Sequence, residues 1–530
     1  MDTRAPATTV PGMPRQKNSH GQYFTPPAVA KLMVSLVRSP KDAGVLEPSA
    51  GQGVFLDALD DAGFTDLTGV EVDPELVARS ARPLQRASFV SWRPPRSYQA
   101  VLGNPPYIRW RDLCDTSKRE VEAHPLFGTL FNSLSDYLTV FIALSVEALA
   151  PGGELVFVTP SFWLHTQHSA PLREWLLTRG AITDIVDFGE AAVFPGVASA
   201  IVVFRFVKGA HADDIDYRQY VGPRRLPTDG LVLADRALFS AKRIPAFASG
   251  CHWSLATRDE QFPAIELERA CTTAGAVPRL GEFVDIANGM VSGLDAVFRV
   301  GDALAAELTP DELAATLPVL KAFQMTPYYS GDTCRYIHLP EGLTEADARA
   351  RYPHLLAHLA AHRDALGKRY ANKKDLPYWD WSFKRSASFF LNGQPKGFVP
   401  SKERLTCRAR ARFTLADAGV ASTQDVTAFA PKDGVRESLA YIVGYLNQPA
   451  VTDWVRLRGL MKGGVAEFSE RPLGSIPFRA IDWDNAGEVA CHDRIVAYVG
   501  EYLAAAVARR AEIEVLLADE FAALLDAGTG

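Results

Sequence analysis

Four consecutive residues carry groups suited to chemistry on an amine: Asn104, Pro105, Pro106 and Tyr107. They follow a short apolar run at residues 100–103 that predicts a strand. The two prolines fix φ and remove two backbone donors, so the carbonyl groups there are held rigidly and point outward. The Asn104 side-chain oxygen and the Pro105 carbonyl could then accept both hydrogens of an aryl amine. Such binding favours a tetrahedral nitrogen whose lone pair points toward an incoming electrophile.

Tyr107 adds an aromatic face on which a ring bearing that amine could stack. The alternative is a proline-rich turn that only ends a strand, as an isolated Asn-Pro-Pro often does. The catalytic interpretation is favoured because a cofactor-binding pattern precedes Asn104 in the expected order.

That pattern is a glycine-containing turn between a predicted strand and a predicted helix. It consists of Glu47, Pro48, Ser49, Ala50, Gly51, Gln52 and Gly53. Two glycines let the backbone pass close to a ligand at the carboxyl end of a strand, where open α/β sheets bind ligands. Glu71 ends the next predicted strand, 20 residues after Gly51, an offset typical of an acid that binds a ribose. The alternatives are a tight strand–helix connection and a solvated charge at a strand end.

The spacing of the glycines in this turn also limits which class of ligand it could bind. It is not the Gly-x-Gly-x-x-Gly of nicotinamide binders, and no P-loop lysine follows. A pyrophosphate is therefore not the obvious ligand. An adenosine with a cationic tail fits better, and Glu47 could meet the cationic end of S-adenosylmethionine.

Around these motifs, the first half of the chain alternates apolar runs with helical patterns, as parallel βαβ units do. Strands are predicted at residues 45–46, 67–72, 100–102, 154–158, 182–188 and 200–207. We expect a disordered lead at residues 1–20 and an α/β catalytic domain at 21–240, with helices on both faces of its sheet. Residues 241–530 are expected to form a second, α+β domain with a helical pattern at about 485–527. The boundary is placed between about residues 209 and 245.

The order of blocks resembles that of the gamma-class amino DNA methyltransferases of type II restriction–modification systems, the adenine-N6 kind with a C-terminal target recognition domain. The similar blocks are residues 20–26, 46–53, 104–107, 135–160 and 188–195, with less specific similarity at 286–293 and 463–478. The resemblance implies a Rossmann-like, S-adenosylmethionine-dependent sheet. It also implies an enzyme that flips adenine out of duplex DNA and methylates N6, and whose functional partner is a cognate restriction endonuclease.

The resemblance assigns further residues. Thr25 is implicated at the methionine part of the cofactor, and the cofactor loop would contribute Ser49, Ala50, Gly51 and Gly53. Phe194 would sandwich the flipped base with Tyr107. One departure stands out, because Ser88-Phe89 occupies the place where the family usually carries an acid followed by an apolar residue. Phe89 could still pack on the cofactor adenine, but the hydrogen bond to the adenine amino group then lacks its usual acceptor.

Charge is distributed unevenly along the chain. The net charge is −6, yet residues 363–412 contain 13 Lys and Arg against four Asp and Glu. A local basic patch is what a nucleic acid backbone senses. Aromatic residues interleave with these cations, and we expect phosphate contacts from four of them: Lys373, Lys374, Lys384 and Arg385.

Other features suggest no further chemistry. The six cysteines are scattered singly, and no apolar run is long enough to span a bilayer, so a reduced, cytoplasmic, bacterial or archaeal protein is expected. His354, His358 and His362 have helical spacing, and we interpret them as a polar helix face and expect no metal. A monomer is expected. The competing functions are a cytosine-N4 DNA methyltransferase, a protein glutamine methyltransferase and a non-catalytic DNA-binding module.

Overall fold

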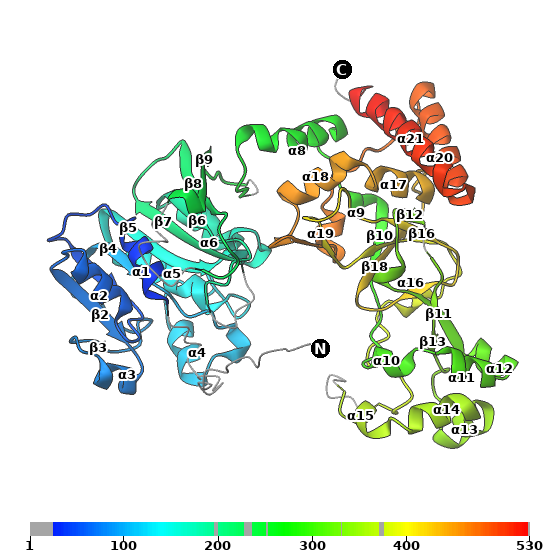
Figure 1. The fold of residues 1–530 in the computed structure, drawn as a ribbon, viewed down its shortest axis with the longest axis horizontal. Helices are drawn as coiled ribbons and strands as arrows, with labels where there is room; N and C mark the ends of the chain where they lie inside the picture. The colour runs from blue at the N-terminus through cyan, green and yellow to red at the C-terminus, as the bar shows by residue number, and fades with distance from the viewer. Residues whose placement is uncertain are drawn as a thin grey trace, which may run out of the picture. The chain divides into compact units, whose positions relative to one another are not determined.

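The computed structural model describes residues 25–194, 200–226, 236–250, 253–329, 331–369 and 376–527. The chain divides into two compact units, Met1–Thr257 and Arg258–Gly530 (Figure 1). The division falls later than residue 240, because β9 (Phe239–Pro245) pairs with β8 (Asp214–Tyr220) and so belongs to the sheet of the first unit. The lead at residues 1–20 lies outside the described residues.

Within its described residues, the first unit contains a nine-stranded sheet in the order β3-β2-β1-β4-β5-β7-β6-β8-β9. Its remaining strands are β1 (Gly44–Glu47), β2 (Asp66–Glu71), β3 (Gln85–Arg86), β4 (Tyr98–Gly103), β5 (Leu149–Pro160), β6 (Gly180–Asp187) and β7 (Ile201–Lys208). The first five strands in this order, β3, β2, β1, β4 and β5, are mutually parallel. Strand β7 runs antiparallel to both of its neighbours, β5 and β6. Glu47, Glu71 and Gly103 each end one of three neighbouring parallel strands. They therefore lie along one edge of the sheet.

Helices cover both faces of this sheet, as predicted. Helices α1 (Pro27–Val34) and α2 (Val54–Asp61) lie on one face, and α5 (Tyr137–Ala148) and α6 (Ala170–Leu177) on the other. The described part of this unit also contains α3 (Pro74–Arg79) and α4 (Asp115–Glu122). The residues of strand β5 alternate between the two faces of the sheet. Leu155 and Phe157 pack in the cluster with α5 and α6. The alternate residues Val156 and Val158 pack in the cluster with α1 and α2. This two-residue alternation is typical of a strand buried on both faces.

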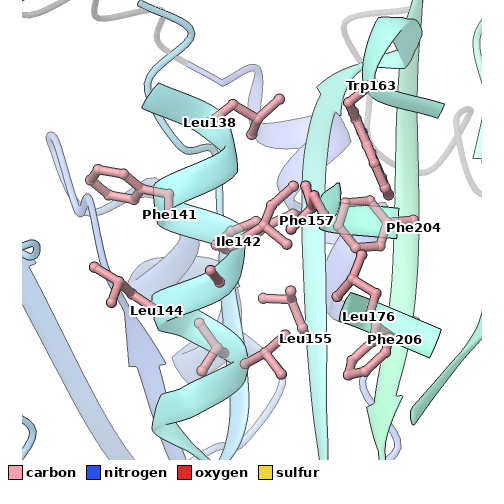
Figure 2. Packing of buried hydrophobic residues seen from close by; sticks show 14 of the residues in the cluster. Leu138, Phe141, Ile142, Leu144, Leu155, Phe157, Trp163, Leu176, Phe204 and Phe206 are labelled. Carbon is pink, nitrogen blue, oxygen red and sulfur yellow. The ribbon is translucent and has the colours of Figure 1, made fainter. Parts of the chain in front are cut away.

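The α5 side of the sheet has a core rich in aromatic residues (Figure 2). Leu138 and Ile142 of α5 lie beside Phe157 of β5, and the rings of Trp163 and Phe204 have centroids 5.0 Å apart. Such close packing resists displacement of the strands. The strand ends that carry the polar residues are therefore held in fixed positions.

The second unit is α+β with a helical end, as expected. Its strands are β10 (Val284–Asn288), β11 (Thr316–Leu320), β12 (Tyr328–Tyr329), β13 (Cys334–Ile337), β14 (Lys396–Pro400), β15 (Lys402–Arg404), β16 (Thr414–Ala416), β17 (Ala421–Ser422), β18 (Val426–Pro431), β19 (Met461–Lys462) and β20 (Val465–Glu467). They form sheets of five, three and three strands within the described ranges. None of the described helices is long and apolar enough to cross a membrane.

Helices pack around these sheets. They are α8 (Arg258–Cys271), α9 (Leu280–Phe283), α10 (Asp295–Phe298), α11 (Asp302–Glu307), α12 (Pro310–Ala314), α13 (Glu345–Arg351), α14 (Pro353–Ala360), α15 (Arg363–Gly367), α16 (Ala387–Phe390), α17 (Leu439–Leu446), α18 (Pro449–Arg458), α19 (Glu470–Gly474), α20 (Ala486–Ala504) and α21 (Val507–Ala527). The predicted C-terminal helical pattern is thus two helices, because the chain leaves the helical conformation at Ala505. Ile495 of α20 and Phe521 of α21 are buried in the same cluster as Tyr445 of α17.

Candidate cofactor and amine-binding site

The glycine turn connects β1 to α2 in a conformation that favours glycine. Gly51 has φ +56° and Gly53 has φ +86°, both in the left-handed region that other residues rarely adopt. The turn is closed by a hydrogen bond from the Gly53 N–H to the Ala50 carbonyl at 2.7 Å. The glycines are therefore required by the shape of the turn itself.

Glu71 binds this turn from the neighbouring strand. Its Oε2 accepts the Gly51 N–H at 2.7 Å, and its Oε1 accepts the Asp73 N–H at 2.8 Å. The side chain is buried, with 5% of the residue exposed, and it lines the pocket described next. Sequence reasoning placed Glu71 at a ligand and did not anticipate that it also holds the loop.

A pocket of about 380 Å³ lies at this edge of the first unit. Its lining comes from six segments, which contribute Pro48, Ser49, Gly51; Glu71, Val72; Ala87, Ser88, Phe89; Asn104, Pro105, Pro106, Ile108; Leu113, Cys114, Thr116, Ser117, Glu120; and Tyr137, Phe141. The structure thus brings together eight of the residues selected from the sequence. The other first-unit candidates, Thr25, Glu47, Ala50, Gly53, Tyr107 and Phe194, are not among the lining residues.

Asn104 follows β4 and is held from two sides. Its Nδ2 donates to Thr25 Oγ1 at 3.1 Å, and its backbone carbonyl accepts the Ser49 hydroxyl at 3.1 Å. Thr25 is 6% exposed and lies 79 residues earlier in the chain. These contacts fix the amide plane at the border of the pocket and join Thr25 to Asn104.

Tyr107 contacts Asn104 through its hydroxyl. The hydroxyl reaches Asn104 Oδ1 within hydrogen-bonding distance and also lies 2.8 Å from the Val158 carbonyl oxygen. A hydroxyl has one proton, so it can donate to only one of these two acceptors at a time. The role of the hydroxyl was missed, because the sequence indicates only an aromatic ring.

Phe194 occupies a different position from the one expected. It is 1% exposed and belongs to the hydrophobic cluster that includes Phe188, Val193 and Tyr220. In this conformation its ring faces the core rather than a base. Stacking on a base would require Phe194 to leave that cluster, at the cost of its buried apolar contacts.

The segment after β3 contributes Ala87, Ser88 and Phe89 to the pocket lining. Phe89 is 5% exposed and packs against Phe141 with ring centroids 5.3 Å apart. Ser88 donates its hydroxyl to Glu120 Oε2 at 2.6 Å. Glu120 belongs to α4 and lines the pocket, although nothing in its sequence neighbourhood marks it for this position.

Glu47 is buried behind the turn. It is 1% exposed, and its Oε2 has no hydrogen-bond partner within the described part of the chain. Burial raises the pKa of this carboxyl well above its usual value, and the nearby carboxylate of Glu71 adds to the rise. A buried carboxyl with an unpaired oxygen is suited to a cation that arrives with a ligand.

The candidate phosphate contacts in the second unit are only partly described. Lys373 and Lys374 lie outside the described residues. Lys384 has a side chain only 13% exposed and forms ion pairs with Asp380 at 2.7 Å and Glu341 at 3.3 Å. The Arg385 Nε–H donates to the Gly289 carbonyl at 3.0 Å. Both described side chains are thus engaged within their own unit.

The three histidines do not share one helix. Helix α14 ends at Ala360, and His362 is the N-cap of α15. His354 Nδ1 lies 2.8 Å from Glu312 Oε2, and His358 Nε2 lies 2.9 Å from the Val297 carbonyl. Within the described ranges, no group of three or more His, Cys, Asp or Glu side chains is arranged to hold a metal ion.

Two family models match the unit that contains this pocket. The model described as N-6 DNA Methylase matches residues 13–63, and the one described as Eco57I restriction-modification methylase matches residues 64–194. The matched ranges include the glycine turn, Glu71 and Asn104. The first unit therefore carries the domains of the N6-adenine DNA methyltransferase family.

Similarity to curated proteins extends over nearly the whole chain. It is 36% identical over 499 residues to the type II methyltransferase M.HindII of Haemophilus influenzae, covering 92% of this chain and 95% of that protein. It is 35% identical to M.HincII of the same species, covering 92% of this chain and 94% of that protein. The chain belongs to the type II restriction–modification DNA methyltransferases.

A solved structure shares the fold at low sequence identity. The type IIL restriction-modification enzyme MmeI, solved in complex with DNA, matches with a TM-score of 0.63 at 12% identity. The match covers 95% of this chain and 72% of that chain. At this identity the likeness concerns the fold.

The cofactor of this family is S-adenosylmethionine, and the pocket fits it. Two backbone donors occupy two of the roughly four lone-pair positions of the Glu71 carboxylate, which leaves acceptors for ribose hydroxyls. Val72, although 47% exposed, lines the pocket together with Phe89 and provides apolar surface for an adenine ring. Glu47, whose buried Oε2 has no hydrogen-bond partner within the described part of the chain, directly precedes the turn.

Proposed function

We propose that this protein methylates adenine N6 within a short sequence of duplex DNA, after the target base has been turned out of the helix. The modification would protect DNA from a cognate restriction endonuclease. The observation that supports this most directly is the position of Asn104 and Pro105 beside a pocket that fits the methyl donor.

The bound cofactor supplies an electrophilic methyl group. The protein then has to present the target nitrogen in the correct geometry. Asn104 Oδ1 and the Pro105 carbonyl accept the two hydrogens of the amino group, which reduces delocalisation of its lone pair into the ring. Because Thr25 and Ser49 already hold Asn104, little reorganisation is needed when the base arrives. The nitrogen–methyl bond forms as the sulfonium–methyl bond breaks, and the nitrogen loses one proton, which passes to solvent water.

The ring of Tyr107 provides the stacking surface for the extruded base. Extrusion costs a few kcal/mol, and stacking together with hydrogen bonding offsets this cost. A purine needs a larger pocket than a pyrimidine, and membership of the N6-adenine family favours the purine. Cytosine N4 is the competing target, since the same two acceptors could serve its amino group.

The second unit would supply duplex DNA binding and sequence recognition. The relatives that match this chain along most of their own length are type II methyltransferases, and the match extends through the second unit. We propose a monomer acting in the cytoplasm of a bacterium. The first unit retains cofactor binding in this scheme, whereas the second provides phosphate contacts whose strength falls with salt.

The decisive experiment identifies the modified nucleoside. DNA from a host that expresses the protein is digested to nucleosides and analysed by mass spectrometry, with the Asn104→Ala variant as the control. N6-methyladenine above the control level supports the proposal, and single-molecule sequencing of the same DNA gives the site. N4-methylcytosine as the sole product would contradict it.

A further inference from the structure

The end of the pocket that we assign to the cofactor adenine has apolar walls and one polar edge. Val72, Phe89 and Ile108 provide apolar surface, and the segment after β3 contributes no acid. An adenine ring stacked there would turn its amino group toward a polar edge. An amino group that loses water needs an acceptor in its place.

Glu120 is positioned to be that acceptor. Among the residues that line the pocket, Glu71 and Glu120 are the carboxylates, and Glu71 serves the loop and the ribose. Glu120 is half-buried and comes from α4, on the opposite side of Asn104 in sequence from Ser88. Its Oε2 accepts the Ser88 hydroxyl at 2.6 Å and its Oε1 accepts the Ser91 hydroxyl at 3.2 Å.

These two serine contacts orient the carboxylate without saturating it. A carboxylate has about four acceptor positions, so two remain for a ligand. Ser88, which stands where the family usually carries an acid, therefore has a structural partner in this site. It orients an acid that reaches the pocket from another element.

We propose that Glu120 accepts a hydrogen bond from the amino group of the cofactor adenine and that Ser88 orients Glu120. The carboxylate accepts, so it favours a 6-amino purine and disfavours a 6-oxo purine, whose oxygen would face it without a proton between them. The protein would thus select its cofactor at the 6-position through α4. This inference rests on the cofactor and is independent of which DNA base is methylated.

The test compares the binding of two ligands in the absence of DNA. Titration calorimetry measures S-adenosylhomocysteine and S-inosylhomocysteine against the full chain and the Glu120→Gln variant. We expect the wild type to prefer the amino ligand by about tenfold or more. In Glu120→Gln this preference should disappear, because the amino ligand weakens while the oxo ligand gains an amide donor.

Two further variants separate recognition from folding. Glu122→Gln alters an exposed acid on the same helix that does not line the pocket, and it should bind both ligands as the wild type does. Adding Ser88→Asp to Glu120→Gln returns an acid to the edge and should restore the preference for the amino ligand. Unchanged amino preference in Glu120→Gln, or equal weakening of both ligands, would overturn the proposal, whereas a failed methylation assay with normal ligand preference would not.

Discussion

Glu71 and Gly51 are joined by a hydrogen bond of 2.7 Å between a strand-end carboxylate and the backbone of the turn that it faces. The glycine turn and the acid that we propose for the cofactor ribose are therefore one structural unit. A change in either residue should affect both loop geometry and ligand binding.

Glu71→Ala should weaken cofactor binding by about 1.5–3 kcal/mol, or roughly tenfold or more, since a charge-assisted acceptor is lost. Glu71→Gln should be almost as damaging, because its amide has one acceptor oxygen for the two backbone donors that the carboxylate serves. Calorimetry with S-adenosylhomocysteine measures both, and Glu75→Ala, an exposed acid of α3, is the control. Wild-type affinity in Glu71→Gln would contradict this account.

Asn104→Ala should reduce methyl transfer by about a hundredfold or more, as loss of a preorganised polar group does. Cofactor affinity should stay within a few-fold, because the amide acts on the target amine. Single-turnover transfer of a radiolabelled methyl group measures the first effect and calorimetry the second. Asn104→Asp retains an acceptor beside Thr25 and should keep partial activity. A substantial fraction of activity in Asn104→Ala would remove the residue from the proposed role.

Glu47 should make the free protein less stable as pH rises. Its pKa is raised in the folded state, so its contribution to stability is complete below the unfolded-state pKa and is lost as pH rises through the higher folded value. Glu47→Gln removes this titration. The variant should therefore unfold at a higher temperature than the wild type at neutral and alkaline pH, yet bind the cofactor less tightly. The same difference in unfolding temperature between the two proteins at every pH would refute the prediction.

Cys114 offers a direct report of pocket occupancy. Its thiol is exposed and lines the pocket, and a hydrogen bond with Ser117 lowers its pKa, which favours the reactive thiolate. Alkylation at Cys114 should slow when S-adenosylhomocysteine is bound. Cys407 is exposed outside the pocket and is the internal control. Peptide mass spectrometry follows both sites, and equal protection of the two cysteines would argue against the pocket.

Glu312 should contribute to acid stability in the second unit. Burial opposes its charge, but hydrogen bonds from Thr309, His354 and Leu355 outweigh burial and lower its pKa to about 2. Its contribution, roughly 3 kcal/mol, is present above the unfolded-state pKa and is lost as pH falls toward 2. Glu312→Gln should lower the denaturant midpoint at pH 7 by more than at pH 3. An equal loss at both values would indicate that packing alone is affected.

The sequence was sufficient to predict the α/β sheet, its two helical layers and the order of the site residues. The reason is topological, because residues that end neighbouring parallel strands meet at one edge of the sheet. Contacts across distant segments could not be predicted this way. Thr25 meets Asn104, and Ser88 meets Glu120, only through the packing of loops and of α4.

The basic stretch shows a second limit of sequence reasoning. Several of its described cations are engaged inside the second unit, where the buried carboxylate of Glu403 pairs with Arg408 at 2.6 Å and Arg412 at 2.7 Å. Lys396 is fully buried and donates to Asn392 Oδ1 at 2.9 Å. A count along the chain does not distinguish cations on a surface from cations within a fold.

The Tyr107 hydroxyl has one proton and two acceptors within reach, so it can adopt two hydrogen-bonded orientations. While the hydroxyl points to Asn104, it donates to the oxygen that we propose as an acceptor for the target amine. When it points to the Val158 carbonyl instead, the hydroxyl keeps a hydrogen-bond partner. Because rotation of the hydroxyl replaces one of its hydrogen bonds with another, the rotation costs little free energy.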